Sequence, residues 1–374
     1  MGQRAIYIWQ KQGWPHFCWD SLRLSTQLAR VHQLQGELTG RLSLLGFETQ
    51  NLTQLEAMTE EVKTSSEIEG QSINVASLRS SIARQLGIET GEVHTDHYAD
   101  GLAQVVVDAS HNYDKELTSN RLFGWHAALF PTGYSGSFRI TVAGWRVGEE
   151  PMQVVSGPMG KETIHYEAPP SHMVPAMMQE FIEWVNNVQT IDSIVKAAIA
   201  HIWFVSIHPF DDGNGRLTRT ITDMLLARAD GMPHRYYSVS AQLCREKKSY
   251  YDIIERTQKS GLDVTMWIEW FVSIVEHALI RALDKLQRVI QKHEYWQHFA
   301  SVNINARQQR IVNMLWDGFE GKLTSSKWAK INKCSQDTAL RDITDLIAKG
   351  MLQKSGEGGR SSNYILPQGY VTTE

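Results

Sequence analysis

The chain is poor in cysteine. Only three are present among 374 residues, Cys18, Cys244 and Cys334, and they lie far apart in the sequence. Their odd number and wide spacing argue against a disulfide framework and indicate reduced thiols, so we expect a cytoplasmic protein. Long apolar runs are missing as well, and we expect neither a secretion signal nor a membrane-spanning segment. Internal repeats and low-complexity stretches are also absent from the sequence.

A strong charge of one sign is the next feature that the chain lacks. It has 37 Lys and Arg residues against 41 Asp and Glu residues, a formal net charge of −4 at pH 7. This balance argues against wholesale binding of nucleic acid. A hydrophobic content of 42% with 9% aromatic residues suits a globular protein with a sizeable core, and the length predicts two or three domains.

The chemistry that is present is concentrated in one run, HPFDDGNGRLTR, from His208 to Arg219. Its glycines, Asp and Asn lie between two segments with helical apolar spacing, which predicts a helix, a glycine-rich loop and a second helix ending at Gly231. The free N–H groups and positive dipole end of that second helix face the loop and favour an anion. Asp212 is a hard oxygen ligand suited to Mg²⁺, and His208 can transfer a proton near neutral pH.

Two arginines complete this run. Arg216 and Arg219 are three residues apart, so they share a helix face and can hold successive phosphates. A glycine turn or a histidine at a helix end is on its own usually structural, and we expect His201 to be such a packed histidine. The combination of an imidazole, a carboxylate, a glycine-rich turn and two arginines at fixed spacing instead predicts a polyphosphate site.

The run resembles the signature of Fic-domain proteins, His-x-Phe-x-(Asp or Glu)-Gly-Asn-Gly-(Arg or Lys)-x-x-Arg, and matches every defined position. The resemblance implies a mainly α fold, with a Fic-type helical core and a small β-hairpin flap. It also implies a protein adenylyltransferase, an enzyme that moves AMP from ATP onto a Ser, Thr or Tyr hydroxyl of a target protein. ATP is then the substrate and Mg²⁺ the metal, and a homodimer is expected because homodimers are common in this family.

The resemblance also assigns roles within the run. His208 would be the general base that deprotonates the target hydroxyl, and Phe210 would anchor the loop in the core. Asp212 would hold Mg²⁺, Arg216 would bind a phosphate oxygen, and Arg219 would contact the γ-phosphate. The α- and β-phosphates would be cradled by Gly213, Asn214 and Gly215. These roles agree with the physics of in-line attack at phosphorus, which needs positioning and charge neutralisation.

A second segment, TSSEIEG, contains Ser65-x-x-x-Glu69-Gly70 and resembles the family's inhibitory motif, (Ser or Thr)-x-x-x-Glu-(Gly or Asn). The spacing predicts a helix from Leu55 to Glu69 with Gly70 at its C′ position. Its inward stripe would be formed by Leu55, Met58, Val62 and either Ser65 or Ser66, with Glu69 on the same stripe. The alternative for so short a pattern is a solvated helix end.

A carboxylate at this position needs a partner. It lies at the negative end of the helix dipole, and a buried carboxylate also requires a cation. The family supplies the second motif arginine, here Arg219. Pairing of Glu69 with Arg219 would occupy the position of the γ-phosphate, so that ATP could not bind productively. Because the motif precedes the core, inhibition would act within one chain.

Two further sets of site residues rest on resemblance. Arg139 to Trp145, Val154-Val155 and Thr163 to Tyr166 predict short strands, and Fic proteins carry here, at about residues 150–168, a hairpin flap that aligns the target backbone. The flap candidates are Ile164, His165 and Tyr166, and the alternative is a plain surface hairpin. Related proteins contact adenine and ribose at the positions that are here occupied by Tyr250, Tyr251 and Gln258. The alternative for the tyrosine pair is a place in the core.

The expected domains are an N-terminal helical region (1–100) with the inhibitory motif at 64–70, a Fic core (101–280), and a linker helix with a small module (281–374). The N-terminal region opens with aromatic residues in WPHFCWD, which resembles a region of some bacterial Fic proteins. Packing and partner contacts are its expected role. Apolar positions in its helices include Leu22, Leu28, Leu34, Leu38 and Leu42.

The C-terminal module, from about Asn303, predicts three helices, a strand, a glycine-rich wing and a strand, an order that is winged-helix-like. The helices are marked by Ile311, Leu315, Trp328, Ile331, Leu340, Ile343, Leu346 and Ile347. Ser335 would cap the recognition helix, Asp337 to Lys349. That helix carries three aspartates, Asp337, Asp342 and Asp345, against Arg341 and Lys349. Because phosphate-facing helices are usually basic, we favour protein contact or dimerisation over DNA.

Two classes of function therefore compete. One is an adenylyltransferase restrained by Glu69, and the other is a winged-helix DNA-binding regulator with a nucleotide-sensing Fic domain. The presence of His208 favours the enzyme, because a sensor needs no base. A third reading stays within the enzyme class: Glu69 could position water and reverse the modification by removing AMP.

Overall fold

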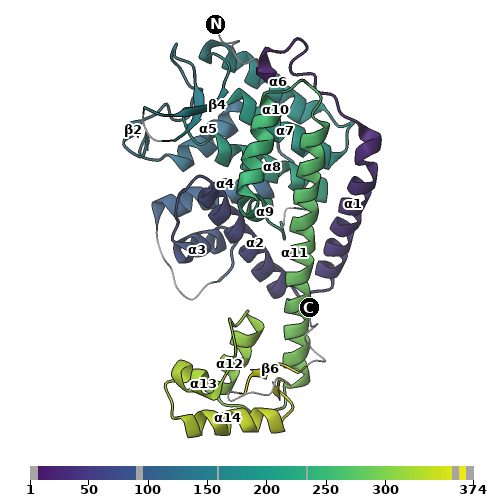
Figure 1. Ribbon diagram of the computed structural model, residues 1–374, viewed down its shortest axis with the longest axis vertical. Helices are drawn as coiled ribbons and strands as arrows, with labels where there is room; N and C mark the ends of the chain where they lie inside the picture. Colours follow the sequence, from purple (N-terminus) through teal and green to yellow (C-terminus); the bar gives the residue numbers. More distant parts are fainter. Residues whose placement is uncertain (1–6, 90–95, 158–159, 233–234, 356–361, 368–374) are drawn as a thin grey trace. The chain divides into compact units, whose positions relative to one another are not determined.

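The computed structural model describes residues 7–89, 96–157, 160–232, 235–355 and 362–367. The chain divides into two compact units, Met1–Ala282 and Leu283–Glu374. This division lies close to the boundary expected at residue 281, whereas the expected N-terminal region and Fic core share the first unit. The described residues are mainly helical, with three two-stranded sheets (Figure 1). None of the described helices is long and apolar enough to cross a membrane.

The centre of the first unit is a pair of helices, α7 (Ser193–Ile207) and α8 (Asn214–Asp230), joined by the loop of the HPFDDGNGR run (Figure 1). α7 buries residues on all its sides, as a core helix does. α8 begins after Gly213, at φ 82°, and ends at Gly231, at φ 64°. Glycine adopts this left-handed conformation without a Cβ penalty. The predicted helix, loop and helix are confirmed, including the end at Gly231.

The other helices of the first unit surround this pair. They are α1 (Ser21–Ser43), α2 (Phe47–Ile68), α3 (Val75–Gln85), α4 (His97–His111), α5 (Ser119–Leu129), α6 (Val174–Asn187), α9 (Val239–Arg245) and α10 (Lys247–Gln258), with short 3₁₀ turns at Ile8–Gln10 and Ser171–Met173. α2, α4 and α5 contact α8, and α6 contacts α7. α1 buries Leu34, Leu38 and Leu42, whereas Leu22 is 84% exposed.

Two antiparallel hairpins belong to the first unit: β1 (Tyr134–Ser135) with β2 (Phe138–Arg139), and β3 (Gln153–Ser156) with β4 (Thr163–Glu167). The expected flap hairpin is therefore present, although residues 158–159 lie outside the described residues. The strand predicted from Arg139 to Trp145 is wrong beyond its first residue. Two of its backbone donors bond outside any strand: the Thr141 N–H donates to the Asp211 carboxylate of the motif loop over 2.8 Å, and the Ala143 N–H donates to His126 Nδ1 over 3.3 Å.

The long helix α11 (Thr265–His298) runs from the first unit into the second. The second unit also contains α12 (Ala306–Trp316), α13 (Ser325–Asn332), α14 (Gln336–Ala348) and the antiparallel pair β5 (Gln353–Lys354) with β6 (Tyr364–Ile365). This is the predicted element order, while the expected wing at 356–361 lies outside the described residues. Ser335 caps α14 as predicted, because its hydroxyl accepts from the Thr338 N–H over 3.2 Å.

The side chains of α14 divide between an exposed face and a buried face. Leu340 and Ile347 do not pack inward, since they are 51% and 38% exposed. Asp342 does not face outward, since it is only 6% exposed and its carboxylate accepts from Arg307 Nε over 2.8 Å and from Asn305 over 2.9 Å. Asp342 therefore adds no negative charge to the outer face of α14.

Candidate functional site

His208 is held at the C-terminal end of α7 in a left-handed backbone conformation, φ 52°. Its Nδ1 lies 3.3 Å from the Val205 carbonyl, and because a carbonyl can only accept, Nδ1 carries the proton. Its own carbonyl accepts from Arg146 Nε over 2.8 Å. Burial lowers the pKa of His208 to about 4. The ring is therefore neutral near pH 7, with an unprotonated Nε2 that can accept a proton.

The motif loop is anchored by Phe210, which is completely buried, as predicted. Phe210 stacks on His126 with ring centroids 4.3 Å apart. His126 Nε2 donates to the Asp212 carbonyl over 3.1 Å, and its Nδ1 accepts from the Ala143 N–H over 3.3 Å. Burial lowers the pKa of His126, which suits this neutral form. His126 thus fixes both the aromatic anchor and the backbone of the loop.

Gly213, Asn214 and Gly215 have different structural roles. The Asn214 amide accepts from the Phe210 N–H over 2.9 Å and donates to the Phe210 carbonyl over 2.8 Å, so it clamps the loop. Gly213 is required sterically, because a Cβ there would lie 2.8 Å from the Phe130 ring. At Gly215 a Cβ would lie 2.1 Å from Glu69 Oε1. The Glu69 carboxylate therefore covers the first turn of α8, where an anion would bind.

Asp212 is partly exposed beside this turn. Its carboxylate accepts from the Ser135 hydroxyl and from the Gly213 N–H. No group of three or more His, Cys, Asp or Glu side chains that could hold a metal occurs among the described residues. Mg²⁺ is commonly bound through one or two carboxylates together with substrate phosphates, so a single carboxylate beside an anion site fits it. Asp212 would hold this ion, and the phosphates would supply the other oxygens.

Arg219 lies on α8 and is only 3% exposed. Its Nη2 donates to Glu69 Oε1 over 2.8 Å and to the Ser65 carbonyl over 2.8 Å, and its Nε donates to the Ser65 hydroxyl over 2.8 Å. Burial acts to lower the pKa of Arg219, but the charge of Glu69 offsets it and the net shift is upward. Ser65, Glu69 and Arg219, three residues of the predicted switch, are therefore brought together.

The helix that carries Glu69 ends where its sequence predicts, although it begins at Phe47 and not at Leu55. Glu69 is the C-cap of α2, and Gly70 follows at φ 74°. The carboxylate is less buried than expected, since the Glu69 side chain is 32% exposed. α2 is fixed farther along by Glu61, whose carboxylate accepts from the Ser238 hydroxyl over 2.7 Å and the Ser240 N–H over 3.1 Å at the start of α9. These hydrogen bonds attach α2, the helix that ends at Glu69, to the start of α9.

Arg216 has partners that the sequence did not reveal. Its Nη1 donates to Gln71 Oε1 over 3.0 Å and approaches the Tyr98 hydroxyl at 3.1 Å. The Tyr98 hydroxyl also donates to Gln71 Oε1 over 2.7 Å. The guanidinium lies 4.7 Å from the centre of the Phe130 ring. The segment that carries Glu69 thus engages both motif arginines, Arg219 through Glu69 and Arg216 through Gln71.

Arg146 is a second residue that the sequence did not single out. It is 4% exposed, and its guanidinium donates to the carbonyls of His208 and Pro169. It therefore links the loop after β2, the motif loop and the segment before α6. No local sequence pattern marks Arg146, His126, Gln71 or Tyr98, because each acts on a partner distant in the chain.

The flap candidates differ in their placement. Ile164 is 46% exposed. His165 is partly exposed and lies between Ser156 Oγ at 2.6 Å and Glu255 Oε2 at 2.7 Å. Tyr166 is 1% exposed, and its hydroxyl donates to the Ser206 carbonyl over 2.7 Å. Tyr166 therefore anchors the hairpin to the core, whereas Ile164 and His165 are accessible to solvent.

The residues expected near adenine are also mostly in the core. Tyr250 is 1% exposed and bonds through its hydroxyl to His201 Nε2 at 2.8 Å, so the prediction of a packed His201 is confirmed. Gln258 is 4% exposed and donates to the Ser206 hydroxyl over 3.2 Å. Tyr251 is 42% exposed, and its hydroxyl donates to the Ile68 carbonyl at the end of α2 over 3.3 Å. Of these three residues, only Tyr251 presents its side chain to solvent.

Comparison with known proteins agrees with this geometry. Residues 116–226 match the Fic/DOC family, and residues 7–88 match a domain of unknown function, DUF4172. A probable protein adenylyltransferase of Aquifex aeolicus is 39% identical over 61 residues, which span 16% of this chain and 19% of the relative. The protein adenylyltransferase Fic of Drosophila grimshawi is 28% identical over 187 residues, 48% of this chain and 35% of the relative. The chain thus spans about a third or less of these curated relatives.

Two solved structures share the fold. A Fic family protein from Desulfovibrio desulfuricans superposes with a TM-score of 0.52 at 17% identity, over 91% of this chain and 96% of that one. A Fic-domain signalling protein from Bacteroides thetaiotaomicron has a TM-score of 0.51 at 17% identity, over 69% of this chain and 95% of that one. Residues 116–226, which contain the complete motif, therefore form a Fic/DOC domain, and a DUF4172 domain at residues 7–88 precedes it.

Proposed function

We propose that this protein transfers AMP from ATP to a hydroxyl side chain of a target protein, and that Glu69 restrains it by pairing with Arg219. The observation that carries this function is the arrangement at the first turn of α8. A neutral His208 and the Asp212 carboxylate flank a helix N-terminus that presents Arg216 and Arg219. Relatives named as protein adenylyltransferases support the reaction class.

In this reaction, His208 Nε2 takes the proton of the target hydroxyl. The hydroxyl oxygen forms a bond to the α-phosphorus, and the bond from that phosphorus to the α–β bridging oxygen breaks. The bridging oxygen leaves with the pyrophosphate. The helix N-terminus and the two arginines neutralise the phosphate charge, as preorganised donors do in such sites. Mg²⁺ at Asp212 would add further charge neutralisation when bound.

Inhibition follows from the same contacts. The Glu69 carboxylate covers Gly215 and holds Arg219, so a negative charge stands where an anionic phosphate would bind. Gln71 accepts from Arg216 and adds a neutral competitor for the other arginine. Glu69 and Gln71 both lie at the C-terminal end of α2 or just after it. The Ser65 hydroxyl, near the same end, accepts a hydrogen bond from Arg219. Binding of ATP in its productive pose would require this helix end to release both guanidinium groups.

The test is incubation of the full chain with labelled ATP and Mg²⁺. Glu69→Gly should gain at least tenfold in self-labelling over wild type, and adding His208→Ala to this variant should abolish the signal. Glu67→Gln is the matched control, because Glu67 lies on the same helix end with a side chain 42% exposed and pairs with Lys63 instead. No gain in Glu69→Gly would overturn the inhibition. Equal labelling after removal of His208 would overturn the mechanism.

A second candidate reaction is removal of AMP from a modified target. The observation in its favour is the 32% exposure of the Glu69 side chain, which leaves the carboxylate accessible to a water molecule. Release of AMP from a labelled target should then be faster with wild type than with Glu69→Gly. Equal release by the two proteins would contradict this role.

We propose further that α14 of the second unit contacts protein, a second copy of the chain being our candidate, in preference to DNA. Leu340 and Ile347 on its outer face are exposed, which suits an apolar partner surface. Asp342 is turned inward, so DNA stays the alternative through Arg341 and the neighbouring lysines.

A further inference from the structure

A cavity of about 420 Å³ opens at the ends of α7 and α8 that lie away from the motif loop. It is lined by Ser193 and Lys196 at the start of α7, and by Leu225 and Arg228 near the end of α8. The segments that follow α4 and α6 complete its walls. Its size is typical of pockets that bind small molecules. The proposed transfer of AMP makes no use of this cavity.

Two cations without a carboxylate partner face this cavity. In the described parts of the chain, no carboxylate lies within 4.0 Å of the Lys196 ammonium or the Arg228 guanidinium. Lys196 donates only to the Val188 carbonyl, and Arg228 donates through Nε and Nη2 to the carbonyls of Tyr113 and Lys115. Arg228 Nη1 therefore has no acceptor among the described residues.

The two charges also disfavour one another. Burial and, after it, the charge of Arg228 lower the pKa of Lys196 to about 8. Burial lowers the pKa of Arg228 as well, with a further contribution from Arg121 and an opposing one from Asp114. Like charges held together in a partly buried site raise its free energy, and an anion bound between them would reverse this effect.

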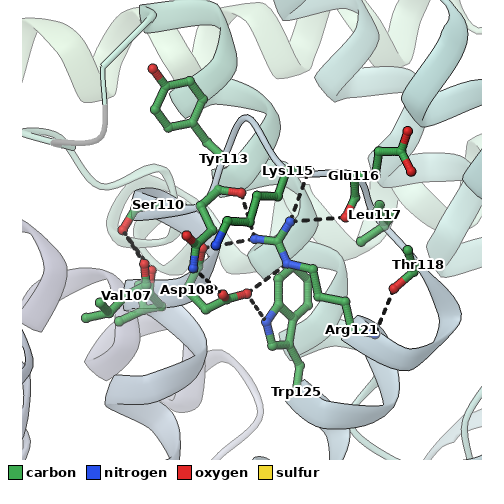
Figure 2. A network of polar contacts seen from close by, with 12 residues as sticks. Val107, Asp108, Ser110, Tyr113, Lys115, Glu116, Leu117, Thr118, Arg121 and Trp125 are labelled. Carbon is green, nitrogen blue, oxygen red and sulfur yellow. Dashed lines mark hydrogen bonds and ion pairs between the residues drawn. The ribbon is translucent and has the colours of Figure 1, made fainter.

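A network of hydrogen bonds holds the segment after α4, which forms one wall of the cavity (Figure 2). Arg121 donates to the Asp108 carboxylate over 2.8 Å and to the carbonyls of Asn112 and Lys115 over 3.0 and 3.1 Å. The amide of Asn186 holds the Leu117 N–H and carbonyl over 2.9 and 2.8 Å. Arg121 is paired with Asp108 and shapes the wall, whereas Lys196 and Arg228 have no carboxylate partner among the described residues.

The remaining lining limits the shape of a ligand. Asp114 and Glu116 are exposed acids, and Tyr113, Val188, Ile191 and Leu225 offer apolar surface. An anionic head at Lys196 and Arg228 therefore suits this cavity when it is attached to an uncharged body, because a second anionic group would face the acids.

We propose that this cavity binds a small phosphomonoester, with its phosphate on Lys196 and Arg228. Such a group carries a charge of about −1.5 to −2 at pH 7, which matches two cations. The free Nη1 of Arg228 and the ammonium of Lys196 supply directed, charge-assisted donors. The site lies at the far ends of α7 and α8 from His208 and does not depend on the proposed AMP transfer.

The first test needs no variant. Acetylation with an N-hydroxysuccinimide ester at pH 7.5, read by mass spectrometry, should modify Lys196 readily because of its lowered pKa. Phenyl phosphate should slow the modification of Lys196 at least fivefold and leave Lys63, whose side chain is 44% exposed, unchanged. Inorganic phosphate should protect Lys196 more weakly. Equal rates with and without phenyl phosphate would overturn the site.

The second test separates this cavity from the motif loop, which also favours phosphate. By calorimetry, Lys196→Met should weaken binding of phenyl phosphate at this site at least tenfold, while Arg219→Met should leave it unchanged. Benzoate, a monoanion of similar shape, should bind at least tenfold more weakly than phenyl phosphate. Unchanged affinity in Lys196→Met would place the ligand elsewhere, and equal affinity for benzoate would contradict the phosphomonoester class.

Discussion

Glu69 and Gly215 touch across the site: a Cβ on Gly215 would lie 2.1 Å from Glu69 Oε1. The carboxylate thus fills space at the helix N-terminus in addition to pairing with Arg219 at 2.8 Å. Competition with a phosphate is therefore steric and electrostatic at once. A side chain added at Gly215 would displace the Glu69 carboxylate. It would therefore change both the filled space and the ion pair with Arg219.

Gln71 should set the availability of Arg216. In a Glu69→Gly background, Gln71→Ala removes one hydrogen bond to Arg216, a contact worth roughly 1 kcal/mol, so ATP-dependent labelling at limiting ATP should rise about fivefold. Gln71→Glu is the matched variant, because it puts a charge at the same position and should lower labelling below the parent. The measurement is the initial rate of self-labelling. A change in the same direction for both variants would show that Gln71 acts only by supporting the fold.

The pH dependence of transfer should reflect the buried state of His208. Because its pKa is lowered to about 4, the ring stays unprotonated from pH 8 down to about pH 5. The labelling rate of Glu69→Gly at saturating ATP should therefore show no fall centred near pH 6.5, the ordinary pKa of histidine. Loss of activity should begin only as the pH approaches 4. A half-maximal rate at pH 6.5 would contradict this environment for His208.

The stability of the first unit should fall with acid for a related reason. His201 is buried and its pKa is lowered to about 3, so between pH 6.5 and 3 the unfolded chain binds a proton that the folded chain does not. Its contribution is therefore fully present above pH 6.5 and is lost by up to about 1.4 kcal/mol per pH unit below it. Urea unfolding at pH 7 and pH 5 should show a smaller loss for His201→Gln than for wild type. The control is the exposed His97, whose replacement by Gln should leave the wild-type pH dependence unchanged.

The features that could be predicted from the sequence are those that depend on neighbouring residues in the chain, such as helix ends and helical spacing. Gly213, Gly231 and Gly70 mark helix ends because of their backbone conformation, and the motif places its arginines by helical spacing alone. The partners of those residues come from elsewhere in the chain. The stacking of His126 on Phe210 and the bond from Arg216 to Gln71 join segments that only the fold brings together.

The wrong strand prediction at Arg139 to Trp145 has the same origin. The apolar and β-branched residues after Arg139 resemble a strand, yet the Thr141 N–H donates to Asp211 of the motif loop and the Ala143 N–H donates to His126. Tyr250 and Gln258, which are expected near adenine, are held in the core by hydrogen bonds to His201 and Ser206. On α14, helical spacing identifies two possible inward faces, and packing against α12 selects the one that buries Asp342 and exposes Leu340.

The outer face of α14 should mediate association if it contacts a second copy of the chain. Leu340→Glu replaces an apolar side chain that is 51% exposed by a charge, and burial of that charge in an interface is costly. Light scattering should show a homodimer that is weakened at least tenfold by Leu340→Glu. Gln309→Glu adds the same charge at an exposed position on α12 and should leave association intact. A dimer that withstands Leu340→Glu, or a DNA gel shift that Arg341→Ala abolishes, would reverse our preference for protein over DNA.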